Sequence, residues 1–266
     1  MTQVHKLWPL LTALQHYDKS ISTYQRGRGQ LIEAPILAYL IETANGRILY
    51  DVGCDHQKIN HPQLRERYFN PQDFPAGAPE MNEDQRIPHH LARLGLTAAD
   101  VDVIFIGHLH WDHAGGLREL RRCGCGAELH LQHDEWMHSQ NDPSVFPDDL
   151  LDEEGQALQF KLNRGEYELV PGVQAIATPG HTAGHMSMWI ELPKGPPVLL
   201  AGDAADLQEN IDHDIAPGGL WQGNEAMAID SIRKLKKMAK ETGAHLWPNH
   251  DIDFYRGLHT FPRAYE

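Results

Sequence analysis

The sequence predicts an α/β fold with a functional site at the end of a buried strand. Residues 101–106 are mostly apolar and β-branched, which is typical of such a strand. Gly115 and Gly116 follow, and then the start of a helix at 117–120. A polar cluster at 108–113 lies between the two elements, where α/β proteins commonly place their sites. The chain has 266 residues, 41% of them hydrophobic, and we predict a single domain over residues 1–266.

The polar cluster has the composition of a metal site. It contains His108, His110, Asp112 and His113 within six positions. His108 and His110 are two residues apart, so on an extended segment both side chains can face one metal ion. Asp112 and His113 can turn toward a second ion, and imidazole with carboxylate suits zinc and related divalent ions. The protein has 18 histidines, so a single pair would be weak evidence, but this pattern at a strand end is not.

The remaining elements fit two sheets with helices. Residues 34–42 and 47–53 predict strands joined by an Asn45-Gly46 turn, and a first strand is expected near 4–11. Residues 167–177 predict a hairpin, and 224–241 an amphipathic helix capped by Asn224 and ended by Gly243. The long polar segment 56–84 predicts a lid or a dimer contact, and 142–156 a second loop over the site.

Three more polar residues follow predicted strands. His181 stands in Thr178-Pro179-Gly180-His181, where proline and glycine allow a tight turn close to a metal ion. Asp203 ends the apolar strand 197–203, and a buried carboxylate there needs a cation or hydrogen-bond donors. His250 lies near the chain end, beside Asn249. Asp203 is therefore a further candidate metal ligand, and the resemblance described next implies that His181 and His250 are ligands too.

The run from His108 to His113 resembles the His-x-His-x-Asp-His signature of the metallo-β-lactamase superfamily, and residues 178–185 resemble a second segment of that superfamily. The resemblance implies its αβ/βα sandwich, with two β-sheets flanked by helices, and two divalent metal ions, for which Zn²⁺ is expected. It implies one ion on His108, His110 and His181, another on Asp112, His113 and His250, and a bridging Asp203. It also implies that Asp51 supports the site and that His185 is structural.

Several features narrow the choice of family and activity within the superfamily. The commonest β-lactamases have cysteine where Asp203 stands, and glyoxalase II carries a long C-terminal domain, whereas a short tail follows His250 here. Nearly the whole chain resembles the N-acyl homoserine lactonases. That resemblance implies a lactone substrate, opened by a hydroxide that bridges the two metal ions. Asp112 and Asp203 are the predicted catalytic residues, with Asp203 shuttling the proton.

One position departs from the lactonase pattern. The family usually has Asp-Ala-x-Tyr, whose phenol donates a hydrogen bond to the substrate, but this chain has Asp206 in place of the tyrosine. An ionised carboxylate has no proton to donate. Tyr24, Tyr255 and His213 are the candidate replacement donors. Aromatic residues expected to hold an acyl tail are Phe69, Phe74, Phe146, Trp136 and Trp221.

Composition restricts partners and location. The formal charge of −14 at pH 7 argues against nucleic acid and anionic membrane surfaces as partners. Three cysteines without regular spacing and the lack of a signal-peptide pattern favour the cytoplasm. A homodimer stays open, because the segment after Asp55 is a dimer contact in some relatives. Two other functions also stay open, namely a hydrolase of another lactone, phosphodiester or thioester, and a non-catalytic metal-binding protein.

Overall fold

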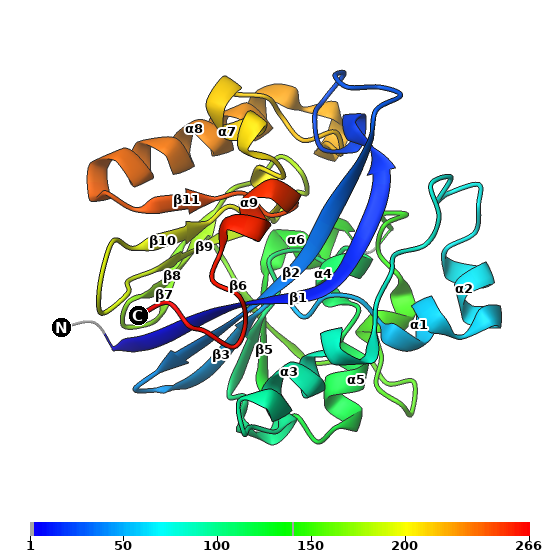
Figure 1. Ribbon diagram of the computed structural model, residues 1–266, viewed down its shortest axis with the longest axis horizontal. Coiled ribbons are helices and arrows are strands. Elements are labelled where there is room, and N and C mark those ends of the chain that lie inside the picture. Colours follow the sequence, from blue (N-terminus) through cyan, green and yellow to red (C-terminus); the bar gives the residue numbers. More distant parts are fainter. Residues whose placement is uncertain (1–2, 140) are drawn as a thin grey trace.

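The computed structural model describes residues 3–139 and 141–266 and confirms the two-sheet α/β architecture (Figure 1). The first sheet has the strand order β1-β2-β3-β4-β5-β6, and the second has the order β11-β10-β9-β8-β7. The strands of the first sheet are β1 (Val4–Asp18), β2 (Leu31–Thr43), β3 (Gly46–Tyr50), β4 (Val103–Phe105), β5 (Glu128–Gln132) and β6 (Phe160–Asn163). Those of the second are β7 (Tyr167–Val170), β8 (Val173–Ala177), β9 (Met186–Ile190), β10 (Val198–Leu200) and β11 (His245–Trp247).

Helices cover the outer faces of both sheets, so the molecule has four layers (Figure 1). The helices are α1 (His56–Asn60), α2 (Pro62–Tyr68), α3 (Ile87–Arg93), α4 (Trp111–Ala114), α5 (Leu117–Arg122), α6 (His133–Ser139), α7 (Gln208–His213), α8 (Glu225–Thr242) and α9 (Ile252–Gly257). Apolar side chains of α3, α4 and α5 pack on the first sheet, and those of α7 and α8 pack on the second. The facing sides of the two sheets form a third apolar core that includes Tyr39, Tyr50, Phe105 and Met188. The alternating strand patterns therefore bury one face of each sheet against the other.

Local sequence signals account for most element boundaries. The Asn224 side chain accepts a hydrogen bond from the Met227 N–H at the start of α8, and Gly243 ends that helix in a left-handed conformation with φ of 74°. Both agree with the prediction for 224–241. The hairpin expected at 167–177 is β7 and β8, which pair antiparallel. The Asn45-Gly46 turn joins β2 to β3, as predicted.

The first strand is longer than predicted, and its extension matters for the site. β1 continues past Leu11 to Asp18, because β2 pairs with it along its whole length. In Figure 1 the β1–β2 hairpin rises from the first sheet toward α7. Its far end is held there by hydrogen bonds from Asn210 Nδ2 to the Ser22 carbonyl and from the Tyr24 N–H to the Ala216 carbonyl, both 2.8 Å.

The segment 56–84 was expected to be one long loop, and the structure shows that this expectation is wrong. It contains α1, capped by the Asp55 side chain, and α2, which begins at Pro62. A buried ion pair fastens α1 to the segment 142–156, with Lys58 Nζ 2.6 Å from Asp149 Oδ1. The two long segments therefore form one joined unit beside the site.

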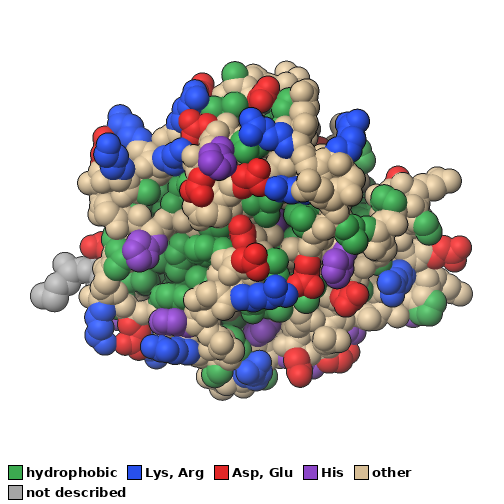
Figure 2. Space-filling model, turned by 45° about the horizontal axis from the view of Figure 1, so that its top comes forward, with side chains coloured by type: hydrophobic (Ala, Val, Ile, Leu, Met, Phe, Trp, Pro, Cys, Tyr) green, Lys and Arg blue, Asp and Glu red, His purple; other side chains and the backbone are tan. Residues whose placement is uncertain are grey.

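The surface mixes charges of both signs. Figure 2 shows Lys and Arg side chains interspersed with Asp and Glu on the face that it presents. Among the described residues, no helix has the length and apolar character needed to cross a membrane.

Candidate metal centre

All seven predicted ligands lie in the loops and short helical turns that follow strands. His108 and His110 come after β4, and Asp112 and His113 lie in α4 immediately beyond. His181 lies between β8 and β9, Asp203 in a short 3₁₀ helix (Gly202–Ala204) after β10, and His250 after β11. The first sheet thus contributes four of the seven side chains and the second sheet three. The site is built where the ends of both sheets meet.

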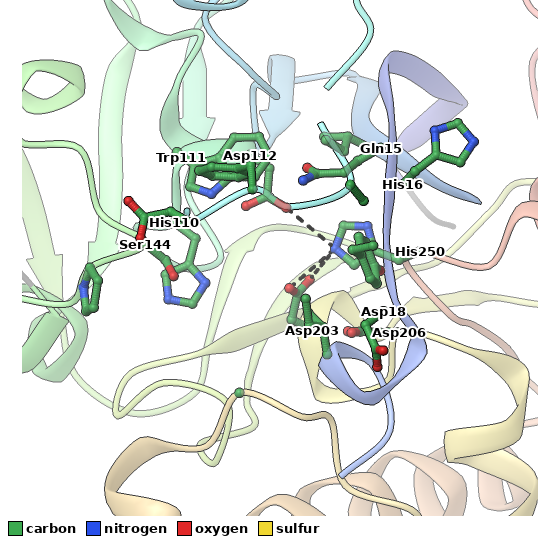
Figure 3. Close-up of a pocket in the computed structure, with 18 of the residues that line it drawn as sticks. Gln15, His16, Asp18, His110, Trp111, Asp112, Ser144, Asp203, Asp206 and His250 are labelled. Atoms are coloured by element: carbon green, nitrogen blue, oxygen red, sulfur yellow. Dashed lines mark hydrogen bonds and ion pairs between the residues drawn. The ribbon is translucent and has the colours of Figure 1, made fainter. Parts of the chain in front are cut away.

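The structure gathers these side chains into two groups around one carboxylate. His108, His110 and His181 form one set whose ligand atoms all lie within 4.8 Å of one another, and Asp112, His113 and His250 form another. Asp203 lies between them. Its carboxylate oxygens are 3.2 Å from Nε2 of both His113 and His250, 3.5 Å from His181 Nε2 and 3.7 Å from His108 Nε2. Figure 3 shows His250 facing Asp203 and Asp112.

These separations suit a shared metal ion. Ligands at tetrahedral positions about 2.0–2.1 Å from zinc are about 3.3 Å apart, close to the spacings observed here. Nε2 of His108 and Nε2 of His113 are buried without a hydrogen-bond partner among the described residues, and both face the carboxylate of Asp203, at 3.7 and 3.2 Å. A buried polar atom without a partner is costly. Divalent cations would satisfy these atoms, so the residues fit a metal centre.

In three of the proposed ligand rings, a hydrogen-bond acceptor at Nδ1 determines which nitrogen faces the centre. His113 donates its Nδ1–H to Asp51 Oδ2 at 2.7 Å, which gives Asp51 its expected supporting role. His250 Nδ1 lies 2.9 Å from the Pro35 carbonyl, and His181 Nδ1 lies 3.1 Å from the Gly219 carbonyl. Each contact leaves Nε2 free to bind a metal ion, as expected for ligating histidines.

The unusual pKa values of the cluster reflect burial and crowding. Burial lowers the pKa of His181 to about 4 and moves that of His108 well below its ordinary value. Burial also acts to lower the pKa of His250, but the carboxylates of Asp203, Asp206 and Asp112 together outweigh it and raise that pKa to about 10. Burial together with the charge of Asp203 raises the pKa of Asp206 to about 8. Without bound cations, protons take the place of positive charge, and metal binding would release them.

Sequence reasoning missed the residue that joins the two ligand-bearing loops. Glu135 in α6 is fully buried, and its carboxylate accepts hydrogen bonds from donors on both loops. The Leu109 N–H donates to it at 3.0 Å, the Thr182 hydroxyl at 2.5 Å and the Gly184 N–H at 3.1 Å. A carboxylate is the only side-chain group with enough acceptor capacity for three donors. Glu135 therefore sets the spacing between His108 and His110 on one loop and His181 on the other.

Two residues position Asp203. Asn249, noted in the sequence only as the neighbour of His250, donates from Nδ2 to Asp203 Oδ1 at 2.9 Å. His185 accepts the Asp203 backbone N–H on Nε2 at 2.9 Å, and its Nδ1 lies 2.8 Å from Thr178 Oγ1. His185 thus lies beneath the cluster, as predicted. Asn249 is 46 residues from Asp203 in sequence, so no local sequence pattern could have predicted this hydrogen bond.

A cavity of about 470 Å³ opens above the cluster. One side is aromatic, with Tyr68, Phe74, Trp111 and Phe146 among the lining residues. Phe74 and Phe146 thus agree with the predicted tail-binding aromatics. Phe69 does not line the cavity and packs behind it against Phe74, Trp111 and Phe146, because it is almost fully buried. Trp136 packs against Phe160 and Trp221 against His138, away from the cavity lining.

The other side of the cavity is polar. It includes Gln15, Tyr17 and Asp18 from the extended end of β1, together with Asp206. The three donors suggested from sequence, Tyr24, Tyr255 and His213, are not among the lining residues. The phenol of Tyr17 is there instead, because the strand that carries it runs seven residues further than predicted.

Comparisons with known proteins agree with this geometry. The model of the metallo-beta-lactamase superfamily matches residues 32–244. The chain is 35% identical over 236 residues to an N-acyl homoserine lactonase of Bacillus sp, with 88% of each chain covered. It is 33% identical over 234 residues to N-acyl homoserine lactonase AiiA of Bacillus thuringiensis subsp. kurstaki, again with 88% of each covered.

Solved structures give the same result. An N-acyl homoserine lactone hydrolase with the product N-hexanoyl-L-homoserine bound at its catalytic metal centre superposes with a TM-score of 0.85. The two chains are 32% identical, and the match covers 99% of this chain and 100% of the other. The ligand motifs, the two-sheet fold and these similarities have one common explanation. The chain belongs to the N-acyl homoserine lactonase family of the metallo-beta-lactamase superfamily.

Proposed function

We propose that this protein is a divalent-metal-dependent lactonase that opens N-acyl homoserine lactones. The observation that carries the proposal is the gathering of six histidine and aspartate side chains around Asp203, at the floor of a cavity with one aromatic side. We further propose that two ions bind, that they are Zn²⁺, and that residues 1–266 form one catalytic domain. The contribution of ligands by both sheets supports the last point.

The proposed ligands follow the two observed groups. His108, His110 and His181 would hold one ion, Asp112, His113 and His250 the other, and Asp203 would contact both. When bound, such ions lower the pKa of water and polarise the ester carbonyl. The reaction adds water across the ester, breaking the bond between the carbonyl carbon and the ring oxygen to give a γ-hydroxy acid.

The chain's own groups would orient the substrate and move the proton. Asp203 takes a proton from water and returns it to the ring oxygen as that oxygen leaves, acting as general base and then general acid. Asn249 holds one Asp203 oxygen and His185 holds its backbone, so the carboxylate stays aimed at the centre. Asp112, the second proposed catalytic carboxylate, lines the cavity beside His250 and would orient the reacting water. The aromatic side of the cavity takes the acyl tail out of water.

The first test is ring opening by metal-quantified protein. We expect hydrolysis of N-hexanoyl and N-decanoyl homoserine lactone, followed by pH-stat titration, about two bound metal ions per chain, and loss of activity on chelation with recovery on adding Zn²⁺. The rate of hydrolysis should depend on bound metal, because without it the ligand side chains carry protons instead of metal ions. Two bound ions without opening of either lactone would refute the substrate, and a phosphodiester in the same assay would test the main alternative.

The aromatic side of the cavity predicts a preference for long tails. Each buried methylene contributes about 0.8 kcal/mol, so kcat/KM should rise from N-butanoyl to N-decanoyl homoserine lactone. Phe146 contacts the rings of Tyr68 and Trp111 within this wall. Phe146→Ala should raise KM for the decanoyl substrate about tenfold and change that for the butanoyl substrate little, which serves as the internal control. Equal effects on both substrates would show that the tail binds elsewhere.

The cellular location is also a proposal. We infer that the protein works in the cytoplasm, and the three unpaired cysteines, Cys54, Cys123 and Cys125, support a reducing compartment.

A further inference from the structure

The polar side of the cavity contains a carboxyl group that none of the steps above uses. Asp206 lines the cavity and is only 3% exposed, yet its Oδ1 has no hydrogen-bond partner among the described residues. An unpartnered buried acceptor is costly unless something fills it. In Figure 3 Asp206 and Trp111 lie on opposite sides of Asp203. The free acceptor is therefore on the side of the reacting centre away from the aromatic wall.

Asp206 is held in place from two directions. Its backbone carbonyl accepts the His250 N–H at 2.8 Å, and its carboxyl group lies within 4.8 Å of the ligand atoms of Asp203 and His250. The Ser22 hydroxyl lies beside its side chain. Ser22 Oγ in turn lies 2.8 Å from the Tyr17 hydroxyl. This group is rigidly placed beside the position where a lactone carbonyl would react.

The order of hydrogen bonds makes this wall an acceptor surface. If Ser22 donates to Asp206, it must accept from Tyr17, so the protons of both hydroxyls are directed along the chain toward Asp206. What remains unfilled in this wall of the cavity is acceptor capacity on Asp206. A carboxyl group keeps an acceptor oxygen in either protonation state, so an N–H donor on a substrate complements it in both states.

We propose that Asp206, oriented by Ser22 and Tyr17, accepts a hydrogen bond from the amide N–H of the substrate. Asp206 would thereby make the enzyme selective for lactones that carry an acylamino group beside the ring carbonyl. This proposal rests on the proposed lactonase function and identifies the substrate group that Asp206 would recognise. The nitrogen of such a substrate is two bonds from the carbonyl carbon, which matches the closeness of Asp206 to Asp203 and His250. Plain γ-lactones would leave the acceptor unpaired and lose that stabilisation.

The test compares two lactones in three proteins. One lactone is N-decanoyl homoserine lactone, and the other is a γ-lactone with an alkyl chain of similar length and no amide. Asp206→Leu should lower kcat/KM for the amide-bearing lactone by about 30-fold, the effect of losing one hydrogen bond to a carboxyl group. It should change the value for the alkyl lactone less than about threefold. Asp206→Asn keeps an acceptor oxygen and should recover part of the loss. Asp212→Leu is the control for lost negative charge, because Asp212 is an exposed carboxylate in the adjoining helix α7.

Two further readouts separate selectivity from structural damage. Bound metal should stay unchanged in Asp206→Leu. Calorimetry with the ring-opened N-decanoyl homoserine should show weaker binding, whereas binding of a matched hydroxy acid without the amide should not change. Parallel loss of activity on both lactones, or loss of metal, would overturn the proposal. If the wild-type protein opens neither lactone, the proposed function fails, whereas opening of both with no selective effect of Asp206→Leu refutes only the role of Asp206.

Discussion

Asp203→Asn is expected to lower kcat/KM for lactone opening by about a thousandfold, the middle of the range for a positioned acid–base group. The substitution preserves shape but removes the negative charge that four histidine rings share. The amide NH₂ of the new asparagine must face either the Asn249 donor or the histidine rings, whereas both oxygens of Asp203 can accept. Steady-state kinetics and metal analysis of the same preparation measure both consequences, and far-UV circular dichroism checks the fold.

The control for Asp203→Asn is Asp230→Asn, on the exposed face of α8, which should leave kcat/KM and metal content unchanged. Because Asp203 lies between both groups of proposed ligands, we expect the variant to lose metal as well as activity. Turnover close to that of the wild-type protein would rule out proton transfer by Asp203 and require another base.

Glu135→Gln should weaken metal binding about 10- to 100-fold, although Glu135 is not a proposed ligand. All three partners of the Glu135 carboxylate are donors, on Leu109, Thr182 and Gly184. Glutamine has one acceptor oxygen, so its NH₂ group must face at least one of these donors in a site without water access. We also expect the free energy of unfolding to fall by about 1–3 kcal/mol, the cost of an unsatisfied buried polar group.

Metal affinity of the Glu135→Gln variant can be measured by competition with a chromophoric chelator, and stability by urea unfolding of the metal-free protein. Glu154→Gln, on an exposed turn, is the matched control. If the metal-free variant is destabilised but metal affinity is unchanged, Glu135 supports the fold alone and does not set the spacing of the ligand loops.

Parts of the fold could be predicted because they depend on neighbours in sequence. The α8 helix was placed within one residue at each end, since its amphipathic period, Asn224 cap and Gly243 end are all local. The length of β1 was underestimated, because residues 12–18 are strand only by pairing with β2. The helices α1 and α2 were missed, because the polar and proline-bearing composition of 56–84 resembles a loop.

The seven proposed ligands could be named from the sequence, because imidazole and carboxylate groups at strand ends are chemically conspicuous. Their supports could not be named. The acceptors that orient His181 and His250 are backbone carbonyls of Gly219 and Pro35, and every residue has such a carbonyl. The choice of Tyr17 over Tyr24 as the phenol beside the centre likewise required the path of the hairpin.

The sequence by itself determined the fold class, the superfamily and the set of proposed metal ligands, because each depends on residue type and short-range spacing. The tertiary structure alone decided which of those side chains meet, how Glu135 joins the loop of Leu109 to the loop of Thr182, and that Asp206 lines the cavity with an acceptor unfilled. The physical reason is that hydrogen bonds and burial join groups by distance in space, and distant segments come together only when the two sheets pack.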